Sequence, residues 1–187
     1  MSHFEAGPEN FSVLPWGSFA SFASFAVHEF LSMTVFERLT ALLDSHGVAY
    51  DVSRHEPVFT SEEAARVRGA PLASGAKALI CKAGESFVLF VMPADRRLDS
   101  KQARKALGVR GVRFATREEV EQLTTLKPGS IPPFGSLFGF ATYCDEQLSA
   151  QPRINFNAGD HAISVNMSSA DYQKVERPTL GQYTEAA

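Results

Sequence analysis

Two strand-like apolar runs, separated by three residues, constrain the fold of this chain more than any other feature. AKALICK (76–82) and SFVLFVM (86–92) flank the short connection AGE, and such a pattern predicts an antiparallel hairpin. Further strand candidates are VRFA (112–115), LFGFATY (137–143), RINF (153–156) and AISVNM (162–167). These strands lack regular helical crossovers, so we expect an α+β fold with a mixed, mostly antiparallel, barrel-like sheet flanked by helices.

Helix signals lie between these runs. Apolar residues after Met33 recur on one helical face, and Gly47 ends this helix. Thr60 with Glu63 and Thr116 with Glu119 have the spacing of a capping box, which predicts helix starts at both positions. SSADYQKV (168–175) predicts a last helix capped by Ser168.

Composition indicates one globular domain. The chain has 187 residues, of which 44% are hydrophobic and 21% charged, and this is enough to form a stable core without covalent or metal cross-links. Its two cysteines, Cys81 and Cys144, lie far apart, which favours a reducing compartment, the cytoplasm, over a disulfide framework. The histidines show no pair at metal-ligand spacing, so we expect neither a metal nor another cofactor.

Residues 1–32 differ from the rest of the chain. They contain the uncharged repeat SFASFASFA (18–26), and prolines and a glycine interrupt any apolar segment. The stretch has neither the basic start of a secretory signal nor the length of a membrane span, so we expect no membrane association. We expect residues 1–32 to be a poorly ordered extension, with Met33 as a candidate natural start and residues 33–187 as the functional domain.

A basic segment covers residues 96–113. It holds seven Lys/Arg against one acid, 7 − 1, for a local charge of +6. On a helix that begins near Asp99, Lys101, Arg104 and Lys105 share one face. That face fits contact with a phosphate backbone, and a purely solvated helix face is the alternative.

The segment LKPGSIPPFG (126–135) contains three prolines and two glycines in ten residues. Proline fixes φ and removes a backbone donor, while glycine adopts conformations closed to other residues. The segment is therefore a shaped loop, and by itself a rigid connector is a sufficient explanation.

Six strings, in this order and spacing, resemble the YbaK/prolyl-tRNA synthetase-associated editing domain family, from about Thr34 to about Glu176. They are TSEEAA, GAKALICK, RRLDSKQARKALG, RFATREE, PGSIPPFG and INFNAGDHAISVNM. The resemblance implies a mixed, barrel-like sheet flanked by helices and hydrolysis of amino acids wrongly esterified to tRNA, chiefly tRNA for proline. It also implies that Gly129–Pro133 is the family's G-x-x-x-P loop and that Lys77 is the lysine needed for deacylation.

The chemistry of such a substrate fits these residues. An aminoacyl ester is reactive, so the enzyme needs mainly to position water and stabilise an oxyanion, without metal or nucleophile. We expect catalytic roles for Lys77, Gly129, Ser130 and Ile131, the last three through backbone donors in a rigid loop. We expect substrate contacts from Pro133, Phe134, Gly135 and His161, and tRNA contacts from Lys101, Arg104 and Lys105.

Several alternatives remain open at this stage. His161 fits a turn as well as a substrate contact, and Cys144, Asp145 and His161 form a conceivable nucleophilic set. The domain fits a trans-editing deacylase that prefers seryl or threonyl over alanyl or cysteinyl esters, and a non-catalytic tRNA- or synthetase-binding module is the alternative. The expected partner is mischarged tRNA, with a prolyl-tRNA synthetase or another translation factor as an open second partner.

Overall fold

The computed structural model describes residues 33–186, and the expectations for residues 1–32 lie outside this range. Its α-helices are α2 (Val35–Ser45), α3 (Ser61–Arg68), α4 (Ser100–Leu107), α5 (Arg117–Thr124), α6 (Glu146–Ser149) and α7 (Ser169–Glu176), with 3-10 turns η1 (Leu72–Ser74) and η2 (Gly135–Phe138). Its strands are β1 (Tyr50–Arg54), β2 (Ala76–Ala83), β3 (Ser86–Pro93), β4 (Arg96–Leu98), β5 (Val112–Phe114), β6 (Ala141–Asp145), β7 (Arg153–Asn157), β8 (Ile163–Ser168), β9 (Thr179–Gly181) and β10 (Thr184–Ala186). Between residues 33 and 186 no helix combines the length and the apolar character that crossing a membrane requires.

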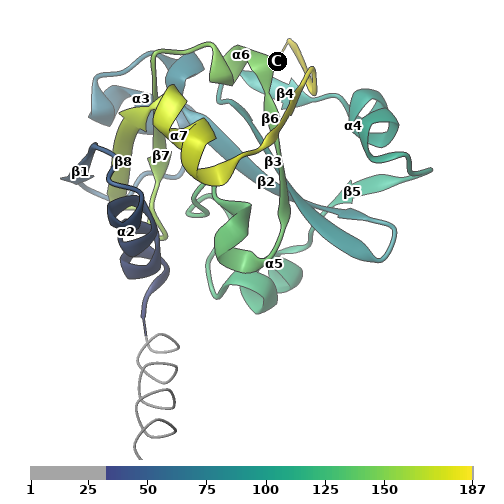
Figure 1. Cartoon of the computed structure of the whole chain (residues 1–187), viewed down its shortest axis with the longest axis horizontal. Helices are drawn as coiled ribbons and strands as arrows, with labels where there is room; N and C mark the ends of the chain where they lie inside the picture. The colour runs from purple at the N-terminus through teal and green to yellow at the C-terminus, as the bar shows by residue number, and fades with distance from the viewer. Residues whose placement is uncertain (1–32, 187) are drawn as a thin grey trace, which may run out of the picture. The chain divides into compact units, whose positions relative to one another are not determined.

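The strands form a five-stranded sheet, a three-stranded sheet and a two-stranded pair (Figure 1). The five-stranded sheet has the order β5-β2-β3-β6-β9, the three-stranded sheet the order β1-β8-β7, and β4 pairs with β10. Among the strand pairs within residues 33–186, β3–β6 and β6–β9 are parallel and the others are antiparallel, and the predicted hairpin is β2–β3. A bridge between Gly75 and Asn155 joins the two larger sheets. The predicted α+β class with a mixed, mostly antiparallel sheet is confirmed.

Strand β3 is buried on both faces. Leu89 and Val91 enter the main core, which the five-stranded and three-stranded sheets share with α2, α5, α6 and α7. The alternate residues Val88, Phe90 and Met92 enter a second cluster with residues from β4, α4 and the β9–β10 connection. Because successive side chains of a strand point to opposite faces, a strand between two cores reads as one continuous apolar run.

Local signals fix the helix starts. The Thr60–Glu63 and Thr116–Glu119 capping boxes are both formed, and Ser168 caps α7 as predicted. The expected strand 137–143 is wrong in its first half, because residues 135–138 form η2 and β6 begins at Ala141. Gly139 separates the two with a φ of 75°, a conformation that interrupts a strand.

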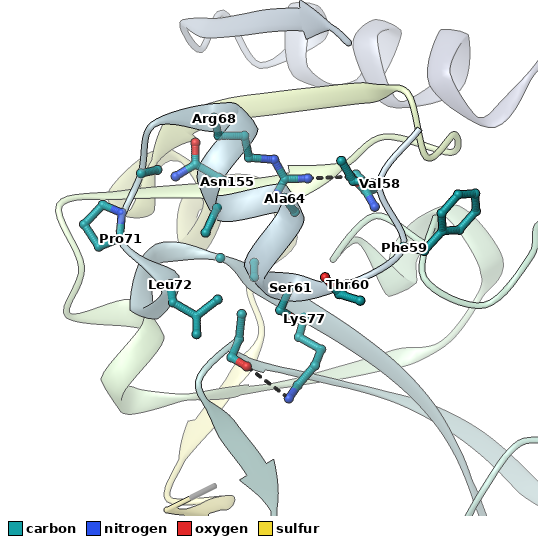
Figure 2. Close-up of a pocket in the computed structure, with 16 residues that line it drawn as sticks. Val58, Phe59, Thr60, Ser61, Ala64, Arg68, Pro71, Leu72, Lys77 and Asn155 are labelled. Carbon is teal, nitrogen blue, oxygen red and sulfur yellow. Dashed lines mark hydrogen bonds between the residues drawn. The ribbon is translucent and has the colours of Figure 1, made fainter. Parts of the chain in front are cut away.

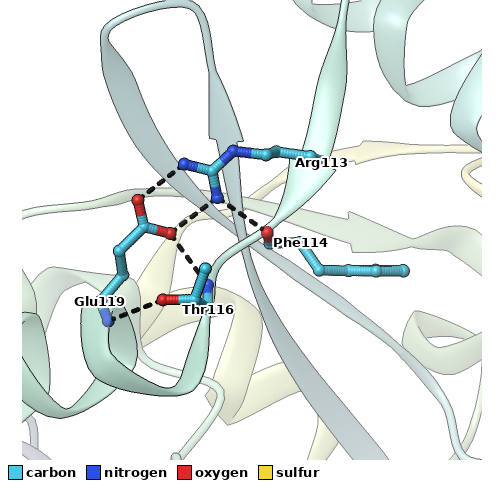
Figure 3. Close-up of polar contacts among 4 residues, drawn as sticks. All are labelled: Arg113, Phe114, Thr116 and Glu119. Carbon is cyan, nitrogen blue, oxygen red and sulfur yellow. Dashed lines mark hydrogen bonds and ion pairs between the residues drawn. The ribbon is translucent and has the colours of Figure 1, made fainter.

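An ion pair holds the start of α5, the helix that leads into the Pro/Gly-rich loop. The two terminal guanidinium nitrogens of Arg113 donate to the Glu119 carboxylate, at 2.7 and 2.6 Å (Figure 3). Glu119 also accepts from the backbone N–H of Thr116 at 2.9 Å. The Arg113 hydrogen bond, followed by the Thr116 hydrogen bond, lowers the pKa of Glu119 from 4.5 to about 2.

This pKa shift predicts a pH-dependent contribution to stability. Because the folded-state pKa is depressed, the contribution is complete above pH 4.5 and is lost as pH falls through about 2. Replacing Glu119 with Gln should lower the Tm at neutral pH, and the difference from wild type should shrink over this acidic window. Glu121→Gln, on the same helix in an exposed pair with Arg117, is the control and should have the smaller effect. A Tm difference that stays constant between pH 5 and pH 2 would contradict a role for the Glu119 charge.

Candidate active site

A cavity of about 90 Å³ lies between α3, η1, the start of β2 and the end of β7 (Figure 2). Its walls are residues 58–61, 64, 65, 68, 70–72 and 75–77, with Ala94, Asn155 and Asn157. The volume is far below the roughly 300–1,000 Å³ of pockets that enclose drug-sized ligands. The cavity therefore suits a small group, with any larger part of a ligand left outside.

Lys77, in β2, lines this cavity as a half-buried cation. Its ammonium donates to the backbone oxygen of Arg96, the first residue of β4, and, at 3.4 Å, to that of Ala94 in the connection after β3. Burial lowers the pKa of Lys77, while the nearby Asp95 carboxylate opposes that shift. An ammonium has three donors, so the two carbonyls fix its position and leave one donor for a ligand.

Lys82, the other lysine of β2, does not share the position of Lys77. Five residues along β2 it faces the other side of the sheet, where its ammonium lies 5.6 Å from the centre of the Phe87 ring. Lys82 is not among the residues that line the cavity. Lys77 is therefore the lysine that β2 contributes to the site.

Arg68, at the end of α3, is a second cation in the cavity wall, and sequence reasoning missed it. Its Nε donates to Ser164 Oγ at 2.8 Å, and its Nη2 donates to Asn157 Oδ1. No carboxylate among residues 33–186 forms a salt bridge with it, and burial lowers its pKa to about 10. The available signal was its position one turn after Ala64, on the buried side of α3.

Among residues 33–186, two cations line the cavity and no Asp or Glu does. Positive charge in a partly buried space favours an anionic or strongly polarised ligand group, such as a phosphate or the oxygen of a reacting ester. Within residues 33–186, no three His, Cys, Asp or Glu side chains come together in a way that would hold a metal ion.

The Gly129–Pro133 loop does not itself line the cavity and is joined to it through Asn157. The amide of Asn157, in the cavity wall, donates to the backbone oxygen of Gly129 at 2.7 Å. The next carbonyl, that of Ser130, accepts from Gly159 N at 2.9 Å. The loop is thus held by the turn between β7 and β8.

Gly129 occupies a position that only glycine suits. Its φ is 91°, and a Cβ there would lie 3.0 Å from Cε1 of His161. The prediction of three free backbone donors needs correction, because Ser130 N donates to Lys127 O at 3.2 Å. Within the described residues, the N–H groups of Gly129 and Ile131 have no hydrogen-bond acceptor.

The three residues predicted to contact substrate at the end of the loop belong to the core instead. Pro133 O accepts from Tyr172 Oη at 2.9 Å, and Phe134 is fully buried, edge-on to Phe156 and Tyr172. Gly135 N donates to Thr142 Oγ1, and a Cβ on Gly135 would lie 2.4 Å from that oxygen. A direct substrate contact from Phe134 or Gly135 does not fit this burial.

His161 stands behind the cavity wall. Its Nδ1 lies 3.1 Å from Val58 O, and its ring centre lies 4.9 Å from that of Phe59, which is 75% exposed. Val58 and Phe59 line the cavity and His161 does not. The histidine therefore supports the wall and the loop, with the turn role that its sequence context also allowed.

The alternative nucleophilic set of Cys144, Asp145 and His161 is excluded. Cys144 is fully buried, and burial raises the pKa of its thiol to about 12, so it carries no thiolate at neutral pH. Asp145 caps α6 and accepts from Tyr183 N at 2.8 Å, while His161 faces Val58. Both cysteines are free thiols.

The basic face of α4 is exposed as predicted. Asp99 caps the helix through the backbone N–H groups of Lys101 and Gln102. Lys101, Arg104 and Lys105 are exposed, and no salt bridge within residues 33–186 involves them. Strand β4, which begins at the Arg96 carbonyl that holds Lys77, leads directly into this helix.

Solved structures define the class of fold. A protein described as a candidate trans-editing enzyme for prolyl-tRNA synthetase matches with a TM-score of 0.74 and 24% identity, over 82% of this chain and 99% of the other. A hypothetical protein, APE2540, matches with a TM-score of 0.73 and 20% identity, over 79% and 99%. At such identities the likeness shows a shared fold.

Sequence comparison goes further. The family model described as the aminoacyl-tRNA editing domain matches residues 55–175. The multifunctional Ser/Thr-tRNA deacylase ProXp-y of Escherichia coli strain K12 is 34% identical over 156 residues, 81% of this chain and 93% of that protein. The prolyl-tRNA editing protein ProX of Acetoanaerobium sticklandii is 23% identical over 151 residues, 78% and 92%. The chain belongs to the aminoacyl-tRNA editing domain family, as its motifs indicated.

The corrected role of Phe134 has a measurable consequence. Phe134→Ala should lower the free energy of unfolding by roughly 3–5 kcal/mol, because it empties a fully buried site between two aromatic rings. Urea titration measures the change, and Phe59→Ala is the exposed control, with an expected loss below about 1 kcal/mol. Equal losses for the two variants would refute the core role.

Proposed function

We propose that this protein is a trans-editing deacylase that hydrolyses the ester bond of mischarged aminoacyl-tRNA. The observation that carries the proposal is the small cavity with Lys77 in its wall, connected through Asn157 to the Gly129–Pro133 loop. The family assignment supports it, as do the names of two relatives, a Ser/Thr-tRNA deacylase and a prolyl-tRNA editing protein.

In the proposed reaction, water attacks the ester carbonyl, the bond to the ribose oxygen breaks, and that oxygen takes a proton. Lys77 presents its remaining donor to the substrate, at the ester or at the terminal nucleotide. Gly129 and Ile131 keep backbone N–H groups without an acceptor in the described chain, and such preoriented donors suit a developing oxyanion. Ser130 helps to fix the loop, because its own N–H already donates to Lys127 O.

The lining of the cavity supports a serine or threonine side chain as the preferred aminoacyl group. Thr60 and Ser61 bring hydroxyl groups to a space that admits only a small group. Polar groups placed for a substrate hydroxyl discriminate strongly against analogues that lack it, because the protein groups are then unpaired. The name of the 34%-identical relative points the same way.

Two further parts of the proposal concern partners. The exposed basic face of α4 is proposed as the tRNA contact, because clustered cations neutralise a phosphate backbone regardless of sequence. A prolyl-tRNA synthetase or another translation factor is a proposed second partner.

We propose the cytoplasm as the site of action, in keeping with two free, buried thiols.

A non-catalytic tRNA- or synthetase-binding module remains the competing function. A pure binder has no need of a fixed ammonium inside a cavity that is too small for a nucleotide. Activity measurements on the same purified protein separate the two functions.

The first functional prediction concerns Lys77. The wild-type protein should deacylate Ser- and Thr-tRNA for proline faster than the Ala- and Cys-charged forms, and Lys77→Ala should slow single-turnover hydrolysis by about 10²–10³-fold. Lys82→Ala, on the opposite face of the same strand, is the matched control and should stay near the wild-type rate. Circular dichroism and Tm confirm that both variants fold.

Two results would count against the proposal. Wild-type hydrolysis rates in Lys77→Ala would remove Lys77 from the mechanism. A wild-type protein that binds tRNA but hydrolyses none of the four esters would favour the binding module.

The second functional prediction concerns α4. Reversing Lys101, Arg104 and Lys105 to Glu should weaken tRNA binding and reduce the slope of log K against log salt by about one for each lost phosphate contact. Lys174→Glu with Arg177→Glu, exposed cations at the end of α7, is the control for nonspecific charge effects. Affinity equal to wild type at low salt would leave α4 as a solvated face.

A further inference from the structure

A chain of side-chain hydrogen bonds connects α3 to the Gly129–Pro133 loop. Arg68 Nη2 donates to the amide oxygen of Asn157, and the amide nitrogen of Asn157 donates to Gly129 O at 2.7 Å. Arg68 and Asn157 both line the cavity, while Gly129 lies beyond it. The contacts bring together residues 89 and 28 positions apart in the sequence.

Arg68 determines which way the Asn157 amide points. A carboxamide has an acceptor oxygen at one end and a donor NH₂ at the other. With the oxygen toward the guanidinium, the NH₂ must face the Gly129 carbonyl. The reversed amide would place NH₂ against a cation and oxygen against oxygen, so the guanidinium selects the orientation that holds the loop.

The carbonyl that Asn157 holds belongs to the peptide group that also contains the N–H of Ser130. A trans peptide group is planar, and its C=O and N–H point in opposite directions. The Ser130 N–H donates to Lys127 O at 3.2 Å, so this plane is held from both sides. The next plane is held by the bond from Gly159 N to Ser130 O, which directs the Ile131 N–H away from Gly159.

Arg68 is itself fixed by hydrogen bonds to the strands beside it. Its Nε donates to Ser164 Oγ, a buried hydroxyl that lies 2.7 Å from Nε2 of His55. The guanidinium therefore bonds two neutral acceptors in two directions, from β8 and from β7. A lysine has the charge but not the planar fork that reaches both acceptors.

We propose that Arg68 is a positioning residue which, through the amide of Asn157, holds Gly129 and the following peptide groups of the loop in the geometry required for deacylation. The proposal rests on the proposed function and deepens it. Lys77 acts on the substrate, whereas Arg68 acts on the protein.

Single-turnover kinetics on Ser-tRNA for proline, in the full-length protein, test the proposal. Arg68→Met and Asn157→Ala should each lower the maximal rate by about 10-fold to 10²-fold, because small displacements of a reacting geometry cost that much, and should leave half-saturation nearly unchanged. The double variant should be no slower than the slower single variant. Arg68→Lys should recover part of the rate, and Arg66→Met, exposed on the same helix, should match wild type.

A second measurement does not depend on activity. In backbone amide NMR spectra, the signals of Gly129, Ser130 and Ile131 should shift in Arg68→Met and in Asn157→Ala, and should stay in place in Arg66→Met and Lys77→Ala. If the wild-type protein proves inactive, the proposed function fails, and these shifts still decide whether Arg68 sets the loop.

Three outcomes would overturn the inference. Loop signals that do not move in Arg68→Met would show that Arg68 does not hold the loop. Rate losses that multiply in the double variant would show that the two residues act independently. A variant that changes half-saturation alone would make Arg68 a direct substrate contact.

Discussion

Burial of the β2–β3 hairpin on both faces is the constraint on which the rest of the structure depends. Because β3 lies between two cores, its neighbour β2 has little room for a charge, yet β2 carries Lys77 near its first residue. Desolvating an ammonium is costly unless polar groups replace water. The backbone oxygens of Ala94 and Arg96 do so at the open end of the hairpin. The cavity that Lys77 lines lies at this same end of the strand.

Much of the fold could be predicted because its signals are local. A capping box such as Thr60–Glu63 needs only four residues, and two apolar runs around a short connection indicate a hairpin within roughly fifteen. Strand β4, helix α6 and strands β9 and β10 escaped prediction, since three or four residues carry no measurable period. Phe134 was misplaced for a related reason. In a loop without periodicity, the sequence does not indicate whether an apolar side chain faces a pocket or the core.

In the candidate site, too, the parts with local sequence signals could be predicted, and the parts that depend on tertiary contacts could not. Lys77 and the loop became candidates through the family's motifs, and in the structure Lys77 lines the cavity whereas Lys82 does not. Motifs could not reveal the link between the cavity and the loop, because Arg68 and Asn157 meet only after β7 has paired with β8. The sequence around Asn157, followed by Ala158 and Gly159, indicates only a turn. Its amide does a second task that depends entirely on tertiary contacts.

The two cations of the cavity, Arg68 and Lys77, differ in how many of their hydrogen-bond donors the protein itself occupies. Both the Nε and one terminal nitrogen of Arg68 are bound to neutral protein acceptors, so its hydrogen bonds are directed to the scaffold. Lys77 is held by two carbonyls and retains a third donor. Among residues 33–186 no Asp or Glu lines the cavity, and its two cations suit the stabilisation of negative charge. Such a site suits a substrate that is reactive already and carries its own hydroxyl next to the ester, as the end of an aminoacylated tRNA does.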